Sequence, residues 1–208
     1  MKRYLSFIGI IVFFLGCEDH SYDYGYDRYY TEIVTALERN VFQLDDGKTL
    51  YSKTEVNANR GDRLFLHYTL LDENNSGFDY TVRVNGAGSV LSRPLKVVSQ
   101  NEMQSMKSEP IQFQSMWIGS HYLNMQFYMD YRSVAHSVAL VVDERSLGES
   151  PLEIHFKHDS NNDPAGFPVH LYASFDLKEI LGEPQQNKQI RIFVNTSNYG
   201  EKIYDLAY

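Results

Sequence analysis

The chain has 208 residues and a formal net charge of −8 at pH 7, with 27 acidic and 19 basic side chains. Nucleic-acid binding requires clustered lysine and arginine, so this balance excludes nucleic acid as an expected partner. A single cysteine excludes an intrachain disulfide, and 16 tyrosines with 12 phenylalanines favour strands.

The N-terminus has the layout of a cleavable lipoprotein signal. Two basic residues precede an apolar run over residues 4–15, which is shorter than the ~20 residues that a membrane-spanning helix needs. Gly16 stands directly before Cys17, and this small residue permits cleavage between them. We therefore interpret residues 1–16 as a signal peptide and Cys17 as a new N-terminus whose sulfur carries a diacylglyceryl group.

Lipidation would make the membrane the first partner of this chain. One acyl chain such as palmitate binds a bilayer only marginally, whereas the two or three chains of a lipoprotein anchor it stably. An ordinary secretory signal with an incidental cysteine is the alternative. Lipidation at Cys17 predicts a protein anchored in the outer membrane, and acylation would also remove an exposed free thiol.

Residues 17–31 are expected to form an acidic, tyrosine-rich tether. No burial pattern is evident before Glu32, and acidic side chains alternate with tyrosines. One interpretation is a flexible spacer. The other is an address, because Glu18 and Asp19 resemble the surface-export signal of Bacteroidota lipoproteins. The second interpretation predicts display on the cell surface, with the periplasmic face as the alternative.

Residues 32–98 alternate between apolar and polar side chains, as expected for a small β-barrel. A first strand region over 33–44 leads through the turn Asp45–Lys48 into a pairing strand at 49–52. A turn over 59–62 precedes a strand whose inward face carries alternate apolar residues from Leu64 to Leu70. Residues 72–77 are expected to form a loop, and the glycine-rich stretch 85–88 is expected to end the next strand.

Residues 99–208 are expected to form a β-sandwich. Ser99 and Glu102 make a capping box for one short helix, which Pro110 ends. Six strand regions follow, most with one-sided alternation, and 136–142 is apolar enough to be buried on both faces. The expected strands cover residues 111–117, 123–131, 136–142, 152–156, 169–175 and 190–194.

The order of these motifs resembles the NigD-like lipoproteins of Bacteroidota. The residues that carry the resemblance, together with the Gly16-Cys17 pair, lie at 44–51, 61–62, 80–85, 116–119, 122–124, 174–177 and 194–196. The resemblance implies an all-β protein with an N-terminal OB-like barrel and a C-terminal sandwich. It implies no catalytic or binding residues, because the family has no established biochemical activity.

Two clusters of metal-ligand side chains occur in the second half. Asp159, Asn161 and Asp163 are spaced like the first half of a calcium loop, but His170 stands where the loop needs its glutamate. A hairpin turn explains the same residues. His155, His158 and His170 are candidate zinc ligands, but the first two would point to opposite faces of a strand and His158 would lie in the loop. We expect no metal and no cofactor.

Catalytic signatures do not emerge. The chain lacks the Gly-x-Ser-x-Gly elbow and the Walker loop, and Gly86-Ala87-Gly88 lacks the third glycine of a dinucleotide motif. Many acids could form a glycosidase pair, and the spacing selects none. Trp117, the only tryptophan, is interpreted as a core residue of the sandwich rather than a sugar-stacking surface residue.

Three functions remain open from the sequence. The first is a non-enzymatic binding or assembly module on the outer membrane, with a glycan, a peptide or an envelope protein as partner. The second is an enzyme acting on surface polysaccharide through an unrecognised carboxylate pair. The third, which rests on the family name alone, is a bacteriocin-linked immunity or secretion factor.

Overall fold

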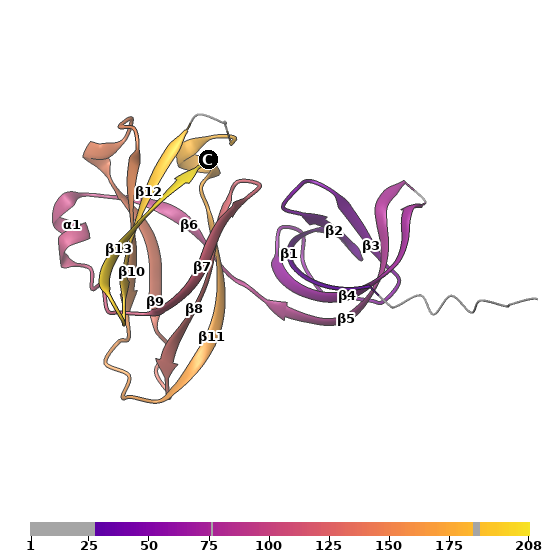
Figure 1. The fold of residues 1–208 in the computed structure, drawn as a ribbon, viewed down its shortest axis with the longest axis horizontal. Coiled ribbons are helices and arrows are strands. Elements are labelled where there is room, and N and C mark those ends of the chain that lie inside the picture. The colour runs from indigo at the N-terminus through magenta and orange to yellow at the C-terminus, as the bar shows by residue number, and fades with distance from the viewer. Residues whose placement is uncertain (1–27, 76, 185–187) are drawn as a thin grey trace, which may run out of the picture.

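Two β-structured bodies lie side by side along the long axis of the molecule (Figure 1). This computed structural model describes residues 28–75, 77–184 and 188–208. The signal peptide, Gly16 and Cys17 therefore lie outside the described residues. None of the helices in the described ranges is long and apolar enough to cross a membrane.

The N-terminal body is a closed barrel with the strand order β1-β2-β3-β5-β4. Its strands are β1 (Tyr29–Glu38), β2 (Val41–Leu44), β3 (Thr49–Ser52), β4 (Arg63–Asn75) and β5 (Phe78–Ser89). Apolar side chains at alternate positions fill the interior, among them Val34, Phe42, Leu50, Leu66 and Val82. The expected OB-like barrel is confirmed.

Turn chemistry in the barrel follows the sequence. Val41–Gln43 pair with Thr49–Tyr51 across the predicted hairpin, and Gly47 adopts a φ of +90° that a glycine tolerates without strain. The turn over 59–62 closes through a hydrogen bond from the backbone N–H of Asp62 to the Asn59 carbonyl oxygen. Both turns are confirmed.

Strand lengths in the barrel differ from the expectation. β4 runs on to Asn75 and β5 begins at Phe78, so the expected 72–77 loop is mostly paired strand. Gly86 and Gly88 lie within β5 and pair with β4, so the glycine-rich stretch does not end the strand. The lack of a side chain at Gly86 and Gly88 does not interrupt backbone pairing, and the hydrogen bonds with β4 stabilise this part of β5.

β1 begins earlier than expected. Tyr29 to Thr31 pair with β4, and the rings of Tyr29 and Tyr30 stack on His67 and Tyr68. Residues 29–31 therefore belong to the barrel, not to the tether. No alternation marked this segment because Tyr29 and Tyr30 are both exposed and make their apolar contacts as ring stacks.

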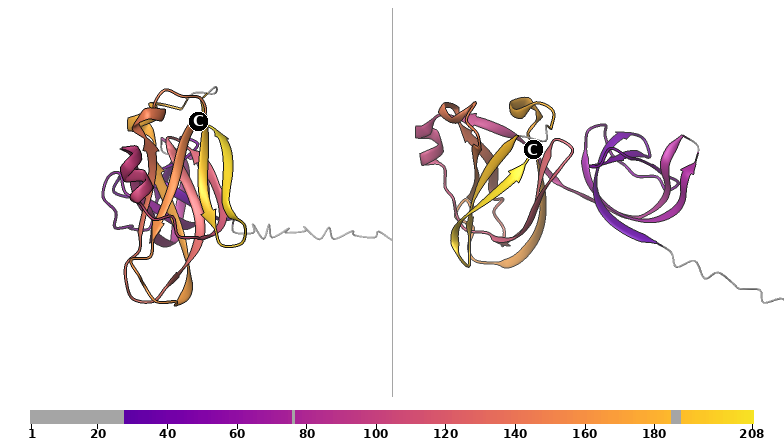
Figure 2. Two further views of the ribbon diagram at one scale, coloured as in Figure 1. Left: turned by 90° about the vertical axis from the view of Figure 1, so that its left-hand side faces the viewer. Right: turned by 45° about the horizontal axis from the view of Figure 1, so that its top comes forward.

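The C-terminal body is a sandwich made from one eight-stranded sheet with the order β13-β12-β10-β9-β6-β11-β8-β7. Its strands are β6 (Leu91–Val98), β7 (Gln112–Gly119), β8 (Tyr122–Tyr131), β9 (Ser137–Asp143), β10 (Leu152–Asp159), β11 (Phe167–Asp176), β12 (Gln189–Thr196) and β13 (Gly200–Ala207). β6 joins the two layers, because residues 91–94 pair with β11 and residues 95–98 pair with β9. The two layers are separated in the right-hand view of Figure 2 and overlap in the left-hand view.

The boundary between the bodies lies at Val90. β5 pairs with β4 up to Ser89, whereas β6 pairs only within the sandwich. The expected boundary between residues 98 and 99 is therefore wrong: β6 was assigned to the barrel because it follows the barrel strands in sequence. Its partners β9 and β11 lie far along the chain, and short-range patterns do not reveal such pairings.

Alternating apolar residues fill the sandwich as predicted. Leu123, Met125 and Phe127 of β8 face Ile154 and Phe156 of β10 in one core cluster. The predicted strand at 136–142 is β9, but its first half is partly exposed. β13 was not predicted, because it is an edge strand with mostly exposed side chains.

Helices are short and lie at the ends of strands. α1 (Gln100–Ser105) begins at the predicted N-cap, where the Ser99 hydroxyl accepts the Glu102 backbone N–H at 3.3 Å. α2 (Lys178–Leu181) and the 3-10 helix η1 (Glu144–Ser146) are each one turn long.

Candidate inter-domain binding site

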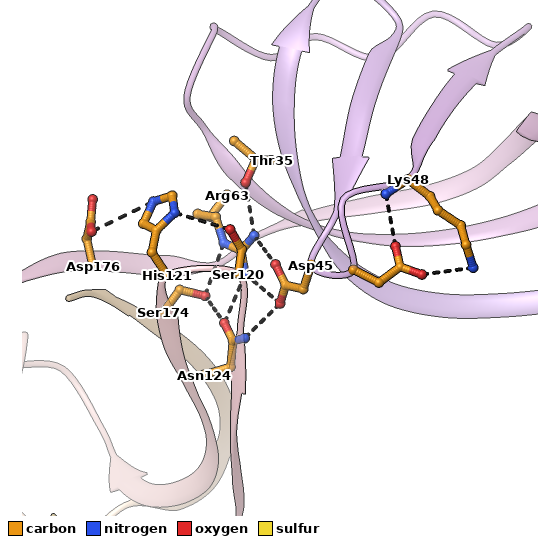
Figure 3. A network of polar contacts seen from close by, with 10 residues as sticks. Thr35, Asp45, Lys48, Arg63, Ser120, His121, Asn124, Ser174 and Asp176 are labelled. Atoms are coloured by element: carbon orange, nitrogen blue, oxygen red, sulfur yellow. Dashed lines mark hydrogen bonds and ion pairs between the residues drawn. The ribbon is translucent and has the colours of Figure 1, made fainter. Parts of the chain in front are cut away.

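Arg63, at the start of β4, joins the two bodies. Its side chain is fully buried and forms a bidentate ion pair with Asp45, with N–O distances of 2.7 and 3.1 Å. The same guanidinium donates to the Thr35 hydroxyl at 3.0 Å and lies 4.1 Å from the centre of the Tyr122 ring. Figure 3 shows Arg63, Asp45 and Thr35 converging where the barrel meets the sandwich.

Two sandwich residues complete this arrangement. Asn124 of β8 accepts from Arg63 at 2.9 Å through its amide oxygen and donates to Asp45 at 2.8 Å through its amide nitrogen. Ser174 of β11 donates to the same amide oxygen at 2.6 Å. We call Arg63, Asp45, Asn124 and Ser174 the inter-domain lock. Because it is buried and every charge has a partner, the lock fixes the two bodies relative to one another.

Gly119, the last residue of β7, makes room for the lock. A Cβ atom at this position would lie 2.1 Å from a carboxylate oxygen of Asp45. The hairpin turn that begins at Asp45 therefore fits against the sandwich only because residue 119 has no side chain.

Beside the lock, a cleft of about 440 Å³ opens between barrel and sandwich. The barrel wall and the sandwich wall contribute both aromatic and polar side chains. They are Thr31, Glu32, Ile33, Leu44, Asp45, Asp46 and Phe65 from the barrel, and Trp117, Gln126 and Tyr172 from the sandwich.

Trp117 lines this cleft and is half-buried. The interpretation of Trp117 as a core residue is wrong: it pairs across strands with Asn124, whose side chain belongs to the lock, and so faces away from the sandwich core. Strand alternation places Trp117 opposite to Met116 and Ile118, which pack against that core.

A row of rings continues from the cleft along the sheet. Phe65 stacks on Tyr172 at a centroid distance of 4.5 Å, and His170 lies 4.7 Å from Tyr172. Tyr128 stacks on His170 at 4.5 Å. Gln126 donates to the Tyr172 hydroxyl and approaches His170 at 2.8 Å. We call Phe65, Tyr172, His170 and Tyr128 the aromatic row.

Besides Asp45, which belongs to the lock, the cleft is lined by two further carboxylates, and both have partners. Glu32 accepts a short hydrogen bond from the Tyr68 hydroxyl, and burial together with this carboxylate raises the pKa of Tyr68. Burial acts to raise the pKa of Asp46, but its hydrogen bonds with Lys48 outweigh burial and lower the pKa. Asp46 is therefore ionised at neutral pH, and Tyr68 remains a donor.

The cleft continues over the barrel surface. A second cavity of about 300 Å³ shares Glu32, Leu44 and Asp46 with the first. Tyr30, Tyr68 and Tyr80 add further rings to its lining.

In the loop that resembles a calcium site, the carboxylates accept hydrogen bonds from groups of the protein itself. Asp159 accepts the Lys107 ammonium at 2.8 Å and the Asn161 backbone N–H at 2.7 Å. Asp163 accepts backbone N–H groups of residues 132–134. Asn161 has a φ of +53°, as in many Asx turns. Within the described ranges, no group of three acidic, histidine or cysteine side chains is arranged to hold a metal.

The three histidines considered for zinc do not converge. His155 stacks on Phe193 of β12, whereas His170 belongs to the aromatic row. His158 lies within β10 rather than in the following loop, and is buried. It approaches His136 at 2.9 Å and the Glu109 carbonyl oxygen at 3.2 Å. A carbonyl only accepts, so Nδ1 of His158 carries a proton.

His136 in turn lies beside Asp163, at 3.4 Å, and both side chains are fully or almost fully buried. Burial alone would raise the pKa of Asp163, but the backbone N–H groups of residues 132–134 and the His136 ring outweigh burial and lower it to about 2. Burial and the neighbouring His136 lower the pKa of His158. The cluster ties the loop before β9 to the loop after β10.

Asp163 should make the sandwich acid-sensitive. Its folded-state pKa lies below the unfolded value of 3.8, so its stabilisation is complete above that value and is lost as the pH falls towards 2. We expect Asp163→Asn to lower the Tm at neutral pH, and the difference from wild type to narrow as the pH falls from about 5 to about 2. Thermal unfolding monitored by circular dichroism measures both. Glu149→Gln, at an exposed position, is the control; a constant difference across that range would contradict the linkage.

Sequence signatures now place the chain among known proteins. Residues 34–90 match the NigD-like N-terminal OB domain, and residues 94–208 match the NigD-like C-terminal beta sandwich domain. The chain belongs to the NigD-like family. This membership confirms the family resemblance, and the match from residue 94 agrees with the change of sheet at Val90. No curated protein is similar enough in sequence to match the chain.

Solved structures support the same fold for this NigD-like chain. A protein of unknown function from Bacteroides vulgatus is 24% identical, with a TM-score of 0.76, over 87% of this chain and 91% of that chain. A NigD-like immunity protein from Bacteroides caccae is 19% identical, with a TM-score of 0.62, over 89% and 94%. A candidate lipoprotein from Bacteroides fragilis is 12% identical, with a TM-score of 0.66, over 87% and 98%.

Proposed function

We propose that this NigD-like protein is a lipid-anchored, non-enzymatic binding module of the outer membrane, and that its ligand occupies the inter-domain cleft. The observation that carries the proposal is the cleft itself, whose aromatic and polar walls come from two bodies held in place by the buried lock. Concave sites with apolar walls and a few placed polar groups are the usual form of ligand sites. The Gly16-Cys17 pair and the candidate lipoprotein among the structural relatives support the anchor.

Binding suits the cleft better than hydrolysis does. A glycosidase needs one carboxyl group whose pKa is raised, so that it can donate a proton. The pKa of Asp46 is lowered through its hydrogen bonds with Lys48, against the effect of burial. Glu32 already accepts from Tyr68. Asp46 is therefore placed to accept hydrogen bonds from a ligand rather than to donate a proton to it.

The immunity function named for the Bacteroides caccae relative is the second candidate. It would make a peptide the occupant of the cleft. Titration with a peptide and with neutral sugars separates this occupant from the one that the cleft chemistry favours.

The anchor is tested by changing the lipidated residue. We expect Cys17→Ser to move the protein from the membrane fraction to the soluble fraction, because the acyl chains are its attachment. Immunoblots of separated fractions and mass spectrometry of the mature N-terminus measure the change. Ser21→Ala, which leaves the Gly16-Cys17 pair intact, should stay with the membrane. Retention of Cys17→Ser in the membrane, with an unlipidated wild-type N-terminus, would refute the anchor.

A further inference from the structure

We propose that the inter-domain cleft and the adjoining aromatic row bind an uncharged oligosaccharide chain. The proposal rests on the proposed function and adds the class of ligand. Its basis is a set of rings from three elements, β4, β8 and β11, that lie in one row beside half-exposed Trp117 and an amide.

Ring orientation in the row suits sugars. Tyr128 and His170 are stacked with an interplanar angle of 14°, and Phe65 and Tyr172 with an angle of 29°. One face of a pyranose presents C–H groups with a small positive charge, which are attracted to the negative face of an aromatic ring. Each stacked pair covers the inner faces of its own two rings, so the outer faces of the pairs and the Trp117 ring are the positions for sugar units.

Polar groups in the cleft suit hydroxyl groups. The Gln126 amide both donates and accepts, and its neighbours Ser115 and Tyr172 hold it in the sheet, at 3.1 and 3.3 Å. Glu32 and Asp46 supply carboxylate oxygens, which accept from hydroxyl groups. Because the chain is acidic overall, the same carboxylates disfavour a ligand with its own negative charge.

A peptide fits the cleft less well. Extended peptides gain affinity by adding a strand to a free sheet edge. The cleft residues Gln126 and Tyr172 lie on β8 and β11, and each of these strands is paired on both sides. The barrel wall is closed and likewise presents no edge. Of the strands that line the cleft, β7, which carries Trp117, is the edge strand of the sheet; the rest of the cleft offers side-chain faces rather than unpaired backbone groups.

The length of the cleft suits a chain of sugars. The two cavities of about 440 and 300 Å³ share three lining residues and so adjoin one another. The barrel is of the OB type, in which oligosaccharides are among the known classes of ligand.

Trp117 provides a direct reporter, because it is the only tryptophan and lines the cleft. The full-length protein in detergent is titrated with the neutral hexasaccharides cellohexaose, mannohexaose and chitohexaose, with hexagalacturonate, and with a lysine-rich hexapeptide. We expect at least one neutral hexasaccharide to change the Trp117 emission saturably. Tyr172→Ala should raise the Kd of that sugar about tenfold, since it removes one stacking face.

Matched variants keep the result interpretable. Gln126→Ala should also weaken binding, while Tyr172→Phe keeps the ring and should weaken it less than Tyr172→Ala. Tyr199→Ala removes a ring that is 75% exposed on the β12–β13 hairpin and should leave the Kd within about twofold. Equal Tm values exclude misfolding as the cause.

The outcomes separate the two proposals. No emission change with any neutral hexasaccharide, or an unchanged Kd in Tyr172→Ala, overturns the saccharide inference. A response to the hexapeptide alone overturns it while supporting a binding module with a peptide ligand. A response to hexagalacturonate alone overturns the uncharged class. Silence towards every probe counts against both the ligand class and the binding function of the cleft.

Discussion

Arg63→Ala is expected to lower the free energy of unfolding by about 3–5 kcal/mol, because it leaves a largely buried carboxylate without its cation. Arg63 is fully buried and the Asp45 side chain is only 18% exposed. Loss of the guanidinium also removes the contacts with Asn124 and the Tyr122 ring. Urea unfolding measures the change.

The same variant should uncouple the two bodies. Each body has its own core cluster, so a broken lock should let the barrel and sandwich unfold in separate transitions, and a protease should cut near Val90. Arg39→Ala is the matched control, since Arg39 forms an ion pair with Glu55 in which both side chains are exposed to solvent. Exposed pairs contribute about 0–1 kcal/mol. If the two alanine variants lost equal stability in a single transition, the lock would have no special role.

Gly119→Ala is expected to lower the free energy of unfolding by about 1–3 kcal/mol, because the added methyl group collides with the lock residue Asp45. The new Cβ would lie 2.1 Å from Asp45 Oδ2, and 2.5 and 2.6 Å from the Cγ and Cβ atoms of the same side chain. Asp45 must then move away, and its bonds to Arg63 and Asn124 lengthen. Calorimetry measures the loss of stability, and the Trp117 emission reports the change in the neighbouring cleft.

Gly88→Ala is the control for this prediction. Gly88 also lies in a strand, and a Cβ there would meet nothing within 4 Å. Alanine in that open strand position should be neutral or slightly stabilising. Similar Tm values for Gly119→Ala and wild type would show that the hairpin turn can withdraw from the sandwich without cost.

Local patterns predicted the fold class and most strands. Alternation along β8 and β10 reports burial of one face directly, so Leu123, Phe127 and Ile154 were placed correctly. The same logic failed where partners are distant in sequence. β6 pairs in parallel with β9 and β11, and no feature of residues 91–98 alone distinguishes these partners from the barrel strands that precede them.

The candidate site was mostly beyond reach of the sequence. Asp45 lies in the predicted turn and Asn124 in the predicted strand over 123–131, and the structure confirms both elements. What joins them is Arg63, whose burial requires two domains to meet. Trp117 was misplaced for the same reason: a large apolar residue in a sandwich strand suggests a core, but a second body can cover the outer face just as well.

The strand that is divided between the two sandwich layers also constrains the order of assembly. Every strand of the barrel lies within one continuous stretch of chain, so that body has its complete set of partners before the sandwich strands have emerged from export. β6 follows in the chain but cannot pair until its later partners β9 and β11 are present. β10 likewise cannot pair with β12 until β12 is present. Such long-range parallel pairings form slowly. A chain that is exported N-terminus first would thus carry a folded N-terminal half beside an exposed, unpaired strand, and chaperone demand should be greatest in that interval.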